Sequence, residues 1–211
     1  IQEAKYIPVD EIYALTEIQG KSEDFEVYLA ETQVGYVAKS FPCSKTGTKE
    51  SVIEGMYAHY LSNNILWDKI RTVCGSYGVY AIPSSMEGVF TLLTYRDPNP
   101  FRSNELFDEI LRSTQDFNIS DEDFERLIAG CFSKELQPKA PSAKGFLEFV
   151  RFLGGIPKSF RNQKIQWLVN SSKEDLYEAK KKLSENIKNS KTAIIFSKPD
   201  EKCRKIIDVR L

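Results

Sequence analysis

Residues 33–95 decide the fold: QVGYVAKSFPCSKTGTKESVIEGMYAHYLSNNILWDKIRTVCGSYGVYAIPSSMEGVFTLLTY. Residues 32–41 alternate Val34, Tyr36 and Ala38 with Gln33, Gly35 and Lys39, which is typical of a half-buried strand. Residues 49–73 instead repeat apolar side chains at about 100° per residue, which predicts a long helix that ends at Gly75. The apolar arc of this helix consists of Val52, Ile53, Met56, Tyr57, Tyr60, Trp67 and Ile70.

Two further alternating segments follow this helix, at residues 77–82 and 89–95. The residues between them include Pro83 and Gly88, so the two segments are predicted to form adjacent antiparallel strands. A strand, a long helix and a hairpin together predict an α+β domain with two layers. We expect a largely antiparallel sheet with helices packed on one face.

The remaining chain is predicted to be mostly helical. Helices are expected at residues 104–114, 120–136, 143–153 and 173–189, and a closing strand at 192–197. The acidic residues 121–123 follow Ser120, a residue type that caps helix starts, so we interpret them as the first turn of a helix and not as a metal site. We interpret residues 1–24 as a lead-in segment and residues 25–211 as a single domain.

The composition limits the classes of function. The chain has 211 residues, of which 41% are hydrophobic, enough for one domain with its own core. With 29 basic and 30 acidic residues the net charge is -1, which argues against a nucleic-acid partner. The longest uncharged run, residues 72–86, contains glycines and a proline, so we expect no membrane partner. The chain begins at Ile1, and we expect it to be a piece of something longer.

The four cysteines contain no C-x-x-C pair, which favours reduced thiols over a disulfide framework. We therefore expect a cytoplasmic location, or an organelle matrix if a leader has been removed. His59 is the only histidine, which excludes a three-histidine zinc site within this chain. His59 is interpreted as a partly buried structural residue, and the lysine run at residues 180–182 as a solvated face.

Arg71 and Tyr77 are the candidate functional residues that the spacing itself suggests. Arg71 lies one turn after Trp67 on the apolar side of the long helix, where an unpaired guanidinium is costly. The small-residue turn at 74–78 brings Tyr77 to the start of the next strand, so both side chains would face one cleft. The alternative interpretation is that Arg71 only caps helix carbonyls and Tyr77 only packs.

Three segments carry a resemblance to a known family. LWDKIRTVCGSYG, residues 66–78, resembles the "IR…GGAYG" signature of the C-terminal domains of the insulinase/pitrilysin family of inverted zinc metallopeptidases. GVFTLLTYRDPN, residues 88–99, is similar to the strand of the presequence-protease subgroup that ends in Ser-Tyr-Arg-Asp-Pro. QVGYVA, residues 33–38, is similar to that subgroup's "qVnYVa" strand, and the three segments occur in the family's order.

The resemblance implies a role within a larger enzyme. The enzymes of this family consist of four related α+β domains around a peptide chamber, and their first domain holds zinc through H-x-x-E-H and a more distant Glu. This chain would be the fourth domain, with no metal site of its own and inactive when isolated. Its Arg71 and Tyr77 match the Arg and Tyr that reach the substrate carbonyl, and Gly75, Ser76 and Gly78 match the substrate-binding loop.

The sequence departs from the family pattern at three positions. Cys74 replaces the usual first Gly of the loop, Ser76 replaces Ala, and Gly35 stands where Asn is common. These departures concern the detail of the loop. We expect the Cys74 thiol to be buried and not to bind metal.

The leading hypothesis is the C-terminal domain of a zinc metalloendopeptidase that degrades unfolded peptides. Its partners would be the N-terminal domains of the same polypeptide and the peptide substrate. The alternative is a non-catalytic structural or assembly subunit of the same superfamily. A third hypothesis, an independent small-ligand binding domain, has no cofactor motif in its support.

Overall fold

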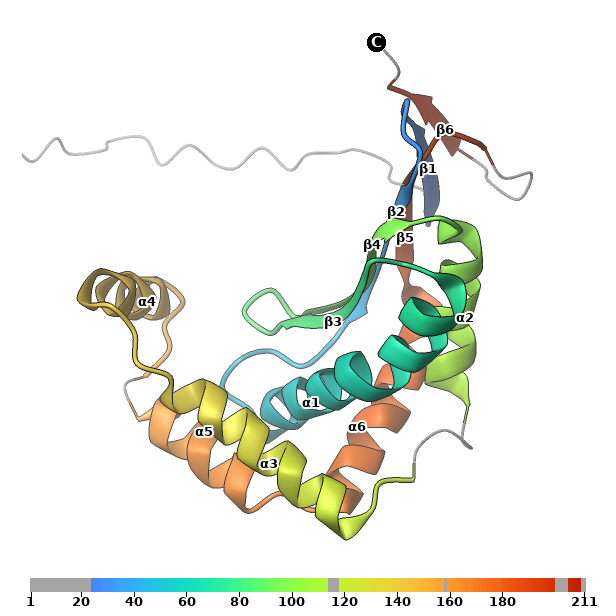
Figure 1. The fold of residues 1–211 in the computed structure, drawn as a ribbon. Coiled ribbons are helices and arrows are strands. Elements are labelled where there is room, and N and C mark those ends of the chain that lie inside the picture. Colours follow the sequence, from blue (N-terminus) through green and yellow to red (C-terminus); the bar gives the residue numbers. More distant parts are fainter. Residues whose placement is uncertain (1–23, 114–117, 158, 200–204, 210–211) are drawn as a thin grey trace, which may run out of the picture.

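A computed structural model describes residues 24–113, 118–157, 159–199 and 205–209 (Figure 1). Its strands are β1 (Phe25–Leu29), β2 (Gly35–Pro42), β3 (Gly78–Ser84), β4 (Val89–Asp97), β5 (Lys191–Phe196) and β6 (Lys205–Asp208). Its helices are α1 (Lys49–Tyr60), η1 (Leu61–Thr72), α2 (Pro100–Arg112), α3 (Asp121–Leu136), α4 (Pro141–Leu153), α5 (Phe160–Val169), α6 (Lys173–Asn186) and η2 (Ile187–Asn189). The predicted lead-in segment, apart from Asp24, lies outside the described residues.

The six strands form one sheet in the order β3-β4-β2-β5-β1-β6. The β3–β4 hairpin, the β2–β4 pair and the β2–β5 pair are antiparallel, whereas β1 lies parallel to both β5 and β6. The α+β class and the hairpin are confirmed. Strands β1 and β6 and helix α5 were not predicted from the sequence, so the parallel part of the sheet was not predicted either.

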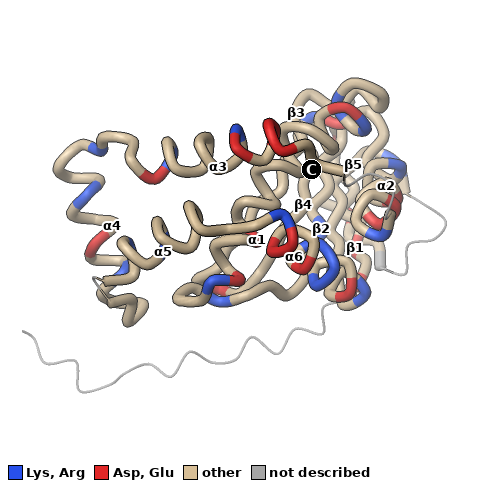
Figure 2. Tube along the Cα trace, turned by 90° about the horizontal axis from the view of Figure 1, so that it is seen from below, with Lys and Arg blue, Asp and Glu red and all other residues tan. Residues whose placement is uncertain are grey.

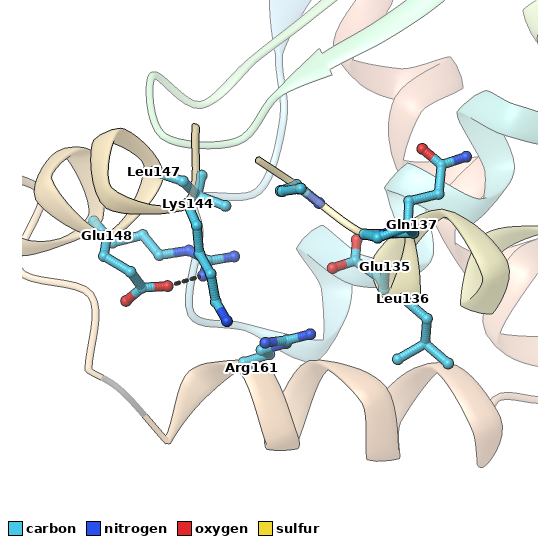
Figure 3. Close-up of a pocket in the computed structure, with 10 residues that line it drawn as sticks. Glu135, Leu136, Gln137, Lys144, Leu147, Glu148 and Arg161 are labelled. Atoms are coloured by element: carbon cyan, nitrogen blue, oxygen red, sulfur yellow. Dashed lines mark hydrogen bonds and ion pairs between the residues drawn. The ribbon is translucent and has the colours of Figure 1, made fainter. Parts of the chain in front are cut away.

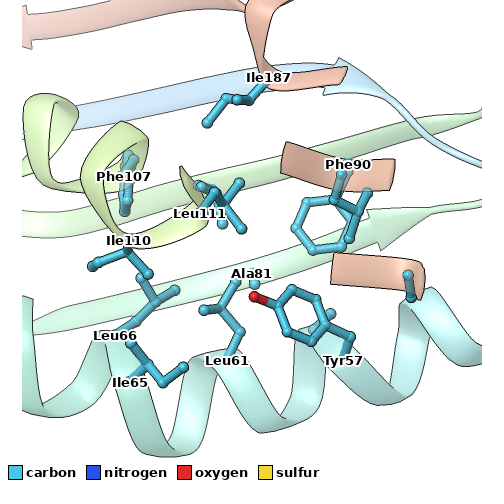
Figure 4. Close-up of a cluster of buried hydrophobic side chains, with 14 of the residues drawn as sticks. Tyr57, Leu61, Ile65, Leu66, Ala81, Phe90, Phe107, Ile110, Leu111 and Ile187 are labelled. Carbon is cyan, nitrogen blue, oxygen red and sulfur yellow. The ribbon is translucent and has the colours of Figure 1, made fainter. Parts of the chain in front are cut away.

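One face of the sheet forms the core with the helices α1, η1, α2 and α6 (Figure 1). Phe90 on β4 and Ala81 on β3 lie beside Tyr57 and Leu61 of the long helix (Figure 4). Phe107, Ile110 and Leu111 cover the same region from α2, and all three are at most 2% exposed. Helices α3 and α5 pack on α1 and on each other as an outer row. The prediction of helices on one face is therefore confirmed.

The opposite face of the sheet carries no helix of the described residues, and we name it the open face. Its positions on the four strands from β3 to β5 are Tyr80, Ile82, Thr91, Leu93, Tyr95, Tyr36, Ala38, Ser40, Ala193 and Ile195. Tyr80, Ile82, Tyr95 and Ile195 are each between 42% and 47% exposed. This face presents aromatic, aliphatic and hydroxyl groups to its surroundings.

The predicted orientation of β2 was wrong. Gly35, Val37, Lys39 and Phe41 face the core, and Tyr36 and the other even-numbered residues lie on the open face. The buried Lys39 is 3% exposed, and its Nζ lies 2.5 Å from Asp108 Oδ2 on α2. Burial lowers the pKa of Lys39, while the hydrogen bond to Asp108 opposes that shift. The ion pair with Asp108 thus compensates the buried charge of Lys39, which the alternating pattern had assigned to the exposed face of the strand.

The predicted helix at residues 49–73 forms, but its second half is a π-helix. Thr48 caps α1 by accepting from the main-chain nitrogen of Ser51. From Leu61 onward the wider turn shifts each side chain relative to an α-helix, so Leu61, Ile65, Leu66 and Ile70 face the core. Trp67, predicted to belong to the apolar arc, is 44% exposed. The cause is the change of helical period, which a fixed angle of 100° cannot represent.

The π-helix also protects the edge of the sheet. Strand β3 is an edge strand, and its Ala81 main-chain nitrogen donates a hydrogen bond of 2.8 Å to Ser62 Oγ on η1. Such side-chain partners satisfy groups that another strand would otherwise pair with. The edge strand is thereby fixed to the helix that carries Arg71.

Charged residues of both signs are interspersed along the outer helices (Figure 2). The acidic start of α3 is confirmed as a capped helix, because Ser120 Oγ accepts from the Asp123 main-chain nitrogen at 3.1 Å. Arg126 then pairs with Glu122 and Asp123 on the same helix. No helix in the described part of the chain is long and apolar enough to cross a membrane.

Helix α4 is the exception to the two-layer arrangement. It stands apart from the helices on the sheet (Figure 1), and none of its residues is buried. Its large apolar side chains Phe146, Phe149, Phe152 and Leu153 are between 56% and 78% exposed. A near neighbour is the hairpin tip, since a side chain at Gly154 would meet Met86 at 2.8 Å. Helix α4 thus presents an apolar surface that the described residues do not cover.

Candidate functional site

Arg71 lies in the last turn of η1 and is held from two sides. Its guanidinium carbon lies 3.7 Å from the centre of the Trp67 ring, a cation–π contact. Its Nε donates a hydrogen bond of 3.1 Å to the main-chain oxygen of Tyr77. No carboxylate of the described residues forms an ion pair with it. The guanidinium is therefore positioned by a ring and a carbonyl, and its positive charge is not neutralised there.

The turn after η1 has the tight geometry that its glycine permits. The main-chain nitrogen of Gly75 donates to the Arg71 oxygen at 3.2 Å, and Gly75 has a φ of 78°, which glycine adopts without strain. Gly75 is exposed, whereas Ser76 is 2% exposed and its Oγ has no partner among the described residues. The turn thus offers main chain to its surroundings at Gly75 and directs the Ser76 side chain inward.

Tyr77 lies at the end of the open face, within a row of three tyrosines. Its side chain is 65% exposed, and its ring centre lies 6.0 Å from that of Tyr95 in an edge-to-face contact. Tyr95 makes the same kind of contact with Tyr36 at 5.6 Å. The main-chain nitrogen of Tyr77 donates to the Arg96 oxygen at 3.2 Å. The phenol is thus held at its base by β4 and remains accessible.

Gly78 lies close to the Tyr80 ring of the same surface. It is buried, and a Cβ atom at this position would lie 2.8 Å from the hydroxyl oxygen of Tyr80. Any larger residue would therefore displace the Tyr80 ring from the strand. The structure places Gly75, Ser76 and Tyr77 between η1 and β3, with Arg71 at the end of η1 and Gly78 at the start of β3. The Arg71 side chain contacts the main chain of Tyr77, and the shared cleft stays a prediction.

Cys74 and Asp97 lie behind this turn. The Cys74 thiol is half-buried and donates to the Lys69 oxygen at 3.6 Å. Burial raises the pKa of Cys74, and the charge of Asp97 raises it further, so this thiol is a poor nucleophile. Asp97 is 0% exposed; its Oδ1 accepts from the Asn99 main-chain nitrogen at 2.8 Å.

Three residues of this surface were not predicted from the sequence. Trp67 was assigned to the core, although it supports Arg71. Tyr95 and Arg96 were noticed only as part of a family motif, whereas the structure places both beside Tyr77. Two successive exposed residues at the end of a strand are a signal for a β-bulge, but alternation alone does not predict where a bulge occurs.

His59 lies in the last turn of α1 and contacts α3. Its Nδ1 is 2.8 Å from Lys134 Nζ and 2.7 Å from Asn63 Nδ2. Burial lowers the pKa of His59, and the neighbouring charge of Lys134 lowers it further. These contacts agree with a partly buried residue that links two helices.

A cavity of about 300 Å³ lies between the end of α3 and the starts of α4 and α5 (Figure 3). Arg161 and Lys144 point into it, and the acids at its wall are already paired, Glu148 with Arg151 and Glu135 with Lys164. Neither Arg71 nor Tyr77 lines this cavity. The candidate site is instead an open surface at the end of η1 and β4.

The described residues include no group of three or more His, Cys, Asp or Glu side chains that would hold a metal ion. The surface at Arg71 and Tyr77 offers a cation, a phenol and main-chain groups. Donors of this kind stabilise an oxygen that gains negative charge, and they neither supply a nucleophile nor bind a metal.

Comparison with known proteins identifies related chains. The profile of the PreP C-terminal domain family matches residues 25–198. Presequence protease 1, chloroplastic/mitochondrial, from Arabidopsis thaliana is 29% identical over 150 residues, which cover 71% of this chain and 14% of that protein. The mitochondrial presequence protease of Schizosaccharomyces pombe is 31% identical over 141 residues, which cover 67% of this chain and 14% of that protein. The chain thus spans about 14% of the length of these relatives.

Solved structures show the same fold. The inactive peptidase domain of a candidate zinc protease from Bordetella parapertussis matches with a TM-score of 0.66 at 14% sequence identity. The match covers 81% of this chain and 96% of that one. At this identity the likeness concerns the fold alone.

Proposed function

This chain belongs to the PreP C-terminal domain family, and on that premise we propose that it is the C-terminal domain of a zinc metalloendopeptidase that degrades unfolded peptides. In this proposal the domain closes one side of a peptide chamber with its open face. The parent protein carries the activity, since the chain spans only a small part of its relatives. The proposed location is the cytoplasm, or an organelle matrix if a leader has been removed.

The proposal rests on one observation above all: the Arg71 side chain at the end of η1 is hydrogen-bonded to the main chain of Tyr77, whose ring lies at the end of the open face. During hydrolysis of a peptide bond the carbonyl oxygen gains negative charge. The Arg71 guanidinium and the Tyr77 hydroxyl are suited to donate hydrogen bonds to that oxygen. Removal of one such donor commonly lowers kcat by about 10²-fold to 10³-fold. In the proposed mechanism both residues are catalytic.

The zinc of this proposal lies outside the chain. Within the described residues the donor set does not fit a metal, because no three ligating side chains lie together. In this proposal the N-terminal domain of the parent holds the zinc, as the resemblance to zinc metallopeptidases implies. The isolated domain is expected to bind no stoichiometric zinc and to cleave no peptide.

The turn between η1 and β3 is the proposed contact for the substrate main chain. Gly75 is exposed and lacks a side chain, so an extended peptide can approach its backbone closely. Ser76 contributes its main chain in this proposal, because its side chain is buried. Gly78 contributes by letting the Tyr80 ring lie flat beside the turn.

The N-terminal domains of the same polypeptide are the proposed partners of helix α4. Phe146, Phe149 and Phe152 would be covered in the whole protein, where their exposure would otherwise favour aggregation. The peptide substrate would occupy the open face.

The proposal differs in a measurable way from a non-catalytic structural role. The full-length parent should contain about one zinc per chain and cleave an unfolded fluorogenic peptide, and a chelator should stop the cleavage. A parent that binds no zinc and cleaves no peptide, yet is folded by thermal melting, would support the alternative of a structural or assembly subunit.

A further inference from the structure

Tyr95 and Arg96 break the alternation of β4. From Val89 to Thr94 every second side chain is buried, but Tyr95 and Arg96 are both exposed and Asp97 is again fully buried. The ladder between β2 and β4 shifts register at this point, so that two residues of β4 lie opposite Tyr36 of β2. This is a β-bulge, a device that turns an additional side chain toward one face.

The bulge requires an unfavourable backbone conformation. Arg96 has a φ of 50°, and it is the one residue other than glycine with a positive φ in the described part of the chain. A non-glycine residue in this region is strained, which costs stability. The conformation is held on both sides, by the Tyr77 nitrogen that donates to the Arg96 oxygen and by the turn that Asp97 forms with Asn99. Glycine would adopt this conformation without strain, so we expect the side chain of Arg96 to have a function that explains its presence at this position.

The Arg96 guanidinium is available for a ligand. Its central carbon lies 5.8 Å from the centre of the Tyr95 ring, near the outer limit for a cation–π contact. No carboxylate of the described residues forms an ion pair with it. The open-face positions of β2, β3 and β4 contain no Asp or Glu. Glu26 of β1 lies on the same face, since it pairs with Ala193, but β2 and β5 separate it from β4. The exposed Arg96 guanidinium, next to a row of tyrosines, therefore has no acidic side chain at the open face on its own strand or on either neighbouring strand.

Arg96 also lies close to the candidate catalytic residues. The main chains of Arg96 and Tyr77 are hydrogen-bonded at 3.2 Å, and Tyr95 contacts the rings of both Tyr77 and Tyr36. Successive residues of an extended peptide are separated by about 3.3 Å along the chain. A peptide whose carbonyl reached Tyr77 would therefore bring a side chain one or two residues away within range of the guanidinium.

We propose that Arg96 is a specificity-determining residue that binds a carboxylate of the peptide substrate next to the cleaved bond. This inference rests on the proposed peptidase function of the same surface. A planar guanidinium binds a carboxylate through two parallel hydrogen bonds, and the Arg96 guanidinium is exposed beside the Tyr95 ring. The carboxylate comes either from an acidic side chain within the peptide or from its free C-terminus.

The test compares three labelled peptides that differ only in one carboxylate. The first has an internal Glu and an amidated C-terminus, the second has Gln in its place, and the third has Gln and a free C-terminus. Binding to the full-length parent is measured by fluorescence anisotropy with a chelator present, and kcat/KM is measured on the zinc-loaded protein. The variants are Arg96→Gln, Arg96→Lys and Arg96→Gly; the glycine variant adopts a positive φ without strain.

The expected result is that the wild type binds the first or the third peptide about tenfold more tightly than the second. That ratio should fall to about one in Arg96→Gln and Arg96→Gly and be partly kept in Arg96→Lys. Arg161→Gln, which removes an exposed cation from α5, should keep the wild-type ratio. Equal binding of all three peptides to the wild type, or an unchanged ratio in Arg96→Gly, would overturn the inference. Absence of cleavage with a preserved binding ratio would instead count against the peptidase proposal alone.

Discussion

The Nε atom of Arg71 donates a hydrogen bond of 3.1 Å to the main-chain oxygen of Tyr77, six positions later in the sequence. This bond closes the turn between η1 and β3 and fixes the Arg71 side chain to the main chain of Tyr77. The Trp67 ring supports the other side of the guanidinium. The fold therefore holds Arg71 in place before a substrate binds. No ion pair to a described residue reduces the attraction of its guanidinium for an anion.

Trp67→Ala should lower kcat of the parent about tenfold, because the Trp67 ring orients Arg71. The effect on stability should be small, because an exposed cation–π contact contributes roughly 0.5–1 kcal/mol. Trp67→Phe, which keeps a ring, should be intermediate. The measurement is steady-state cleavage of a fluorogenic peptide beside a thermal melt. Full activity of Trp67→Ala would mean that the tryptophan does not position Arg71.

His59 should titrate below its ordinary pKa of 6.5, because burial and then the charge of Lys134 disfavour its protonated form. Below pH 6.5 the unfolded chain therefore binds more protons than the folded chain, so stability that is present above this pH should be lost as the pH falls below it. Lys134→Met should raise the pKa of His59. As the only histidine, His59 gives one imidazole signal in a proton NMR titration. A pKa at or above the ordinary value would contradict this.

The buried pair Lys39 and Asp108 should respond asymmetrically to substitution. Asp108→Ala leaves the Lys39 ammonium buried without its partner and should reduce the free energy of unfolding by about 3 kcal/mol. Lys39→Met removes the buried charge and should cost clearly less. Denaturant unfolding of both variants gives the comparison. If Lys39→Met reduced the free energy of unfolding more than Asp108→Ala, the pair would contribute net stability and not only compensate the buried charge of Lys39.

Helix α4 should become more accessible to protease when its apolar face is disrupted. In the full-length parent, Phe146→Ser with Phe149→Ser is expected to speed release of the C-terminal domain in limited proteolysis, because the docking surface loses apolar area. Val169→Ser, an exposed position on α5, is the control. Equal rates for both variants would show that the α4 face is not covered by the N-terminal domains.

The sequence predicted the elements whose patterns are local. The β3–β4 hairpin, the capped start of α3 and the one-sided helical layer all follow from alternation, capping residues and helical spacing. The turn at 74–78 was also predicted, because its glycines and its position after a helix are visible in the sequence. The candidate residues Arg71 and Tyr77 were found in this way.

The remaining features depend on contacts between distant segments. The orientation of β2 was wrong because Lys39 is neutralised by Asp108, 69 positions away, which no local pattern shows. Trp67 was misplaced because η1 changes its helical period. The proposed role of Arg96 depends on a bulge opposite Tyr36 and on a hydrogen bond from the main chain of Tyr77. Such features require the three-dimensional arrangement.

The most direct test is the steady-state rate of peptide cleavage by the full-length parent carrying Arg71→Ala or Tyr77→Phe. Both variants should lower kcat by roughly 10-fold to 10³-fold while zinc content and melting temperature stay unchanged, since each removes a donor to the developing oxyanion. Arg71→Lys should restore only part of the rate because it lacks the planar fork. Wild-type kcat/KM in both variants, or a loss of activity only in proportion to unfolding, would contradict the catalytic assignment.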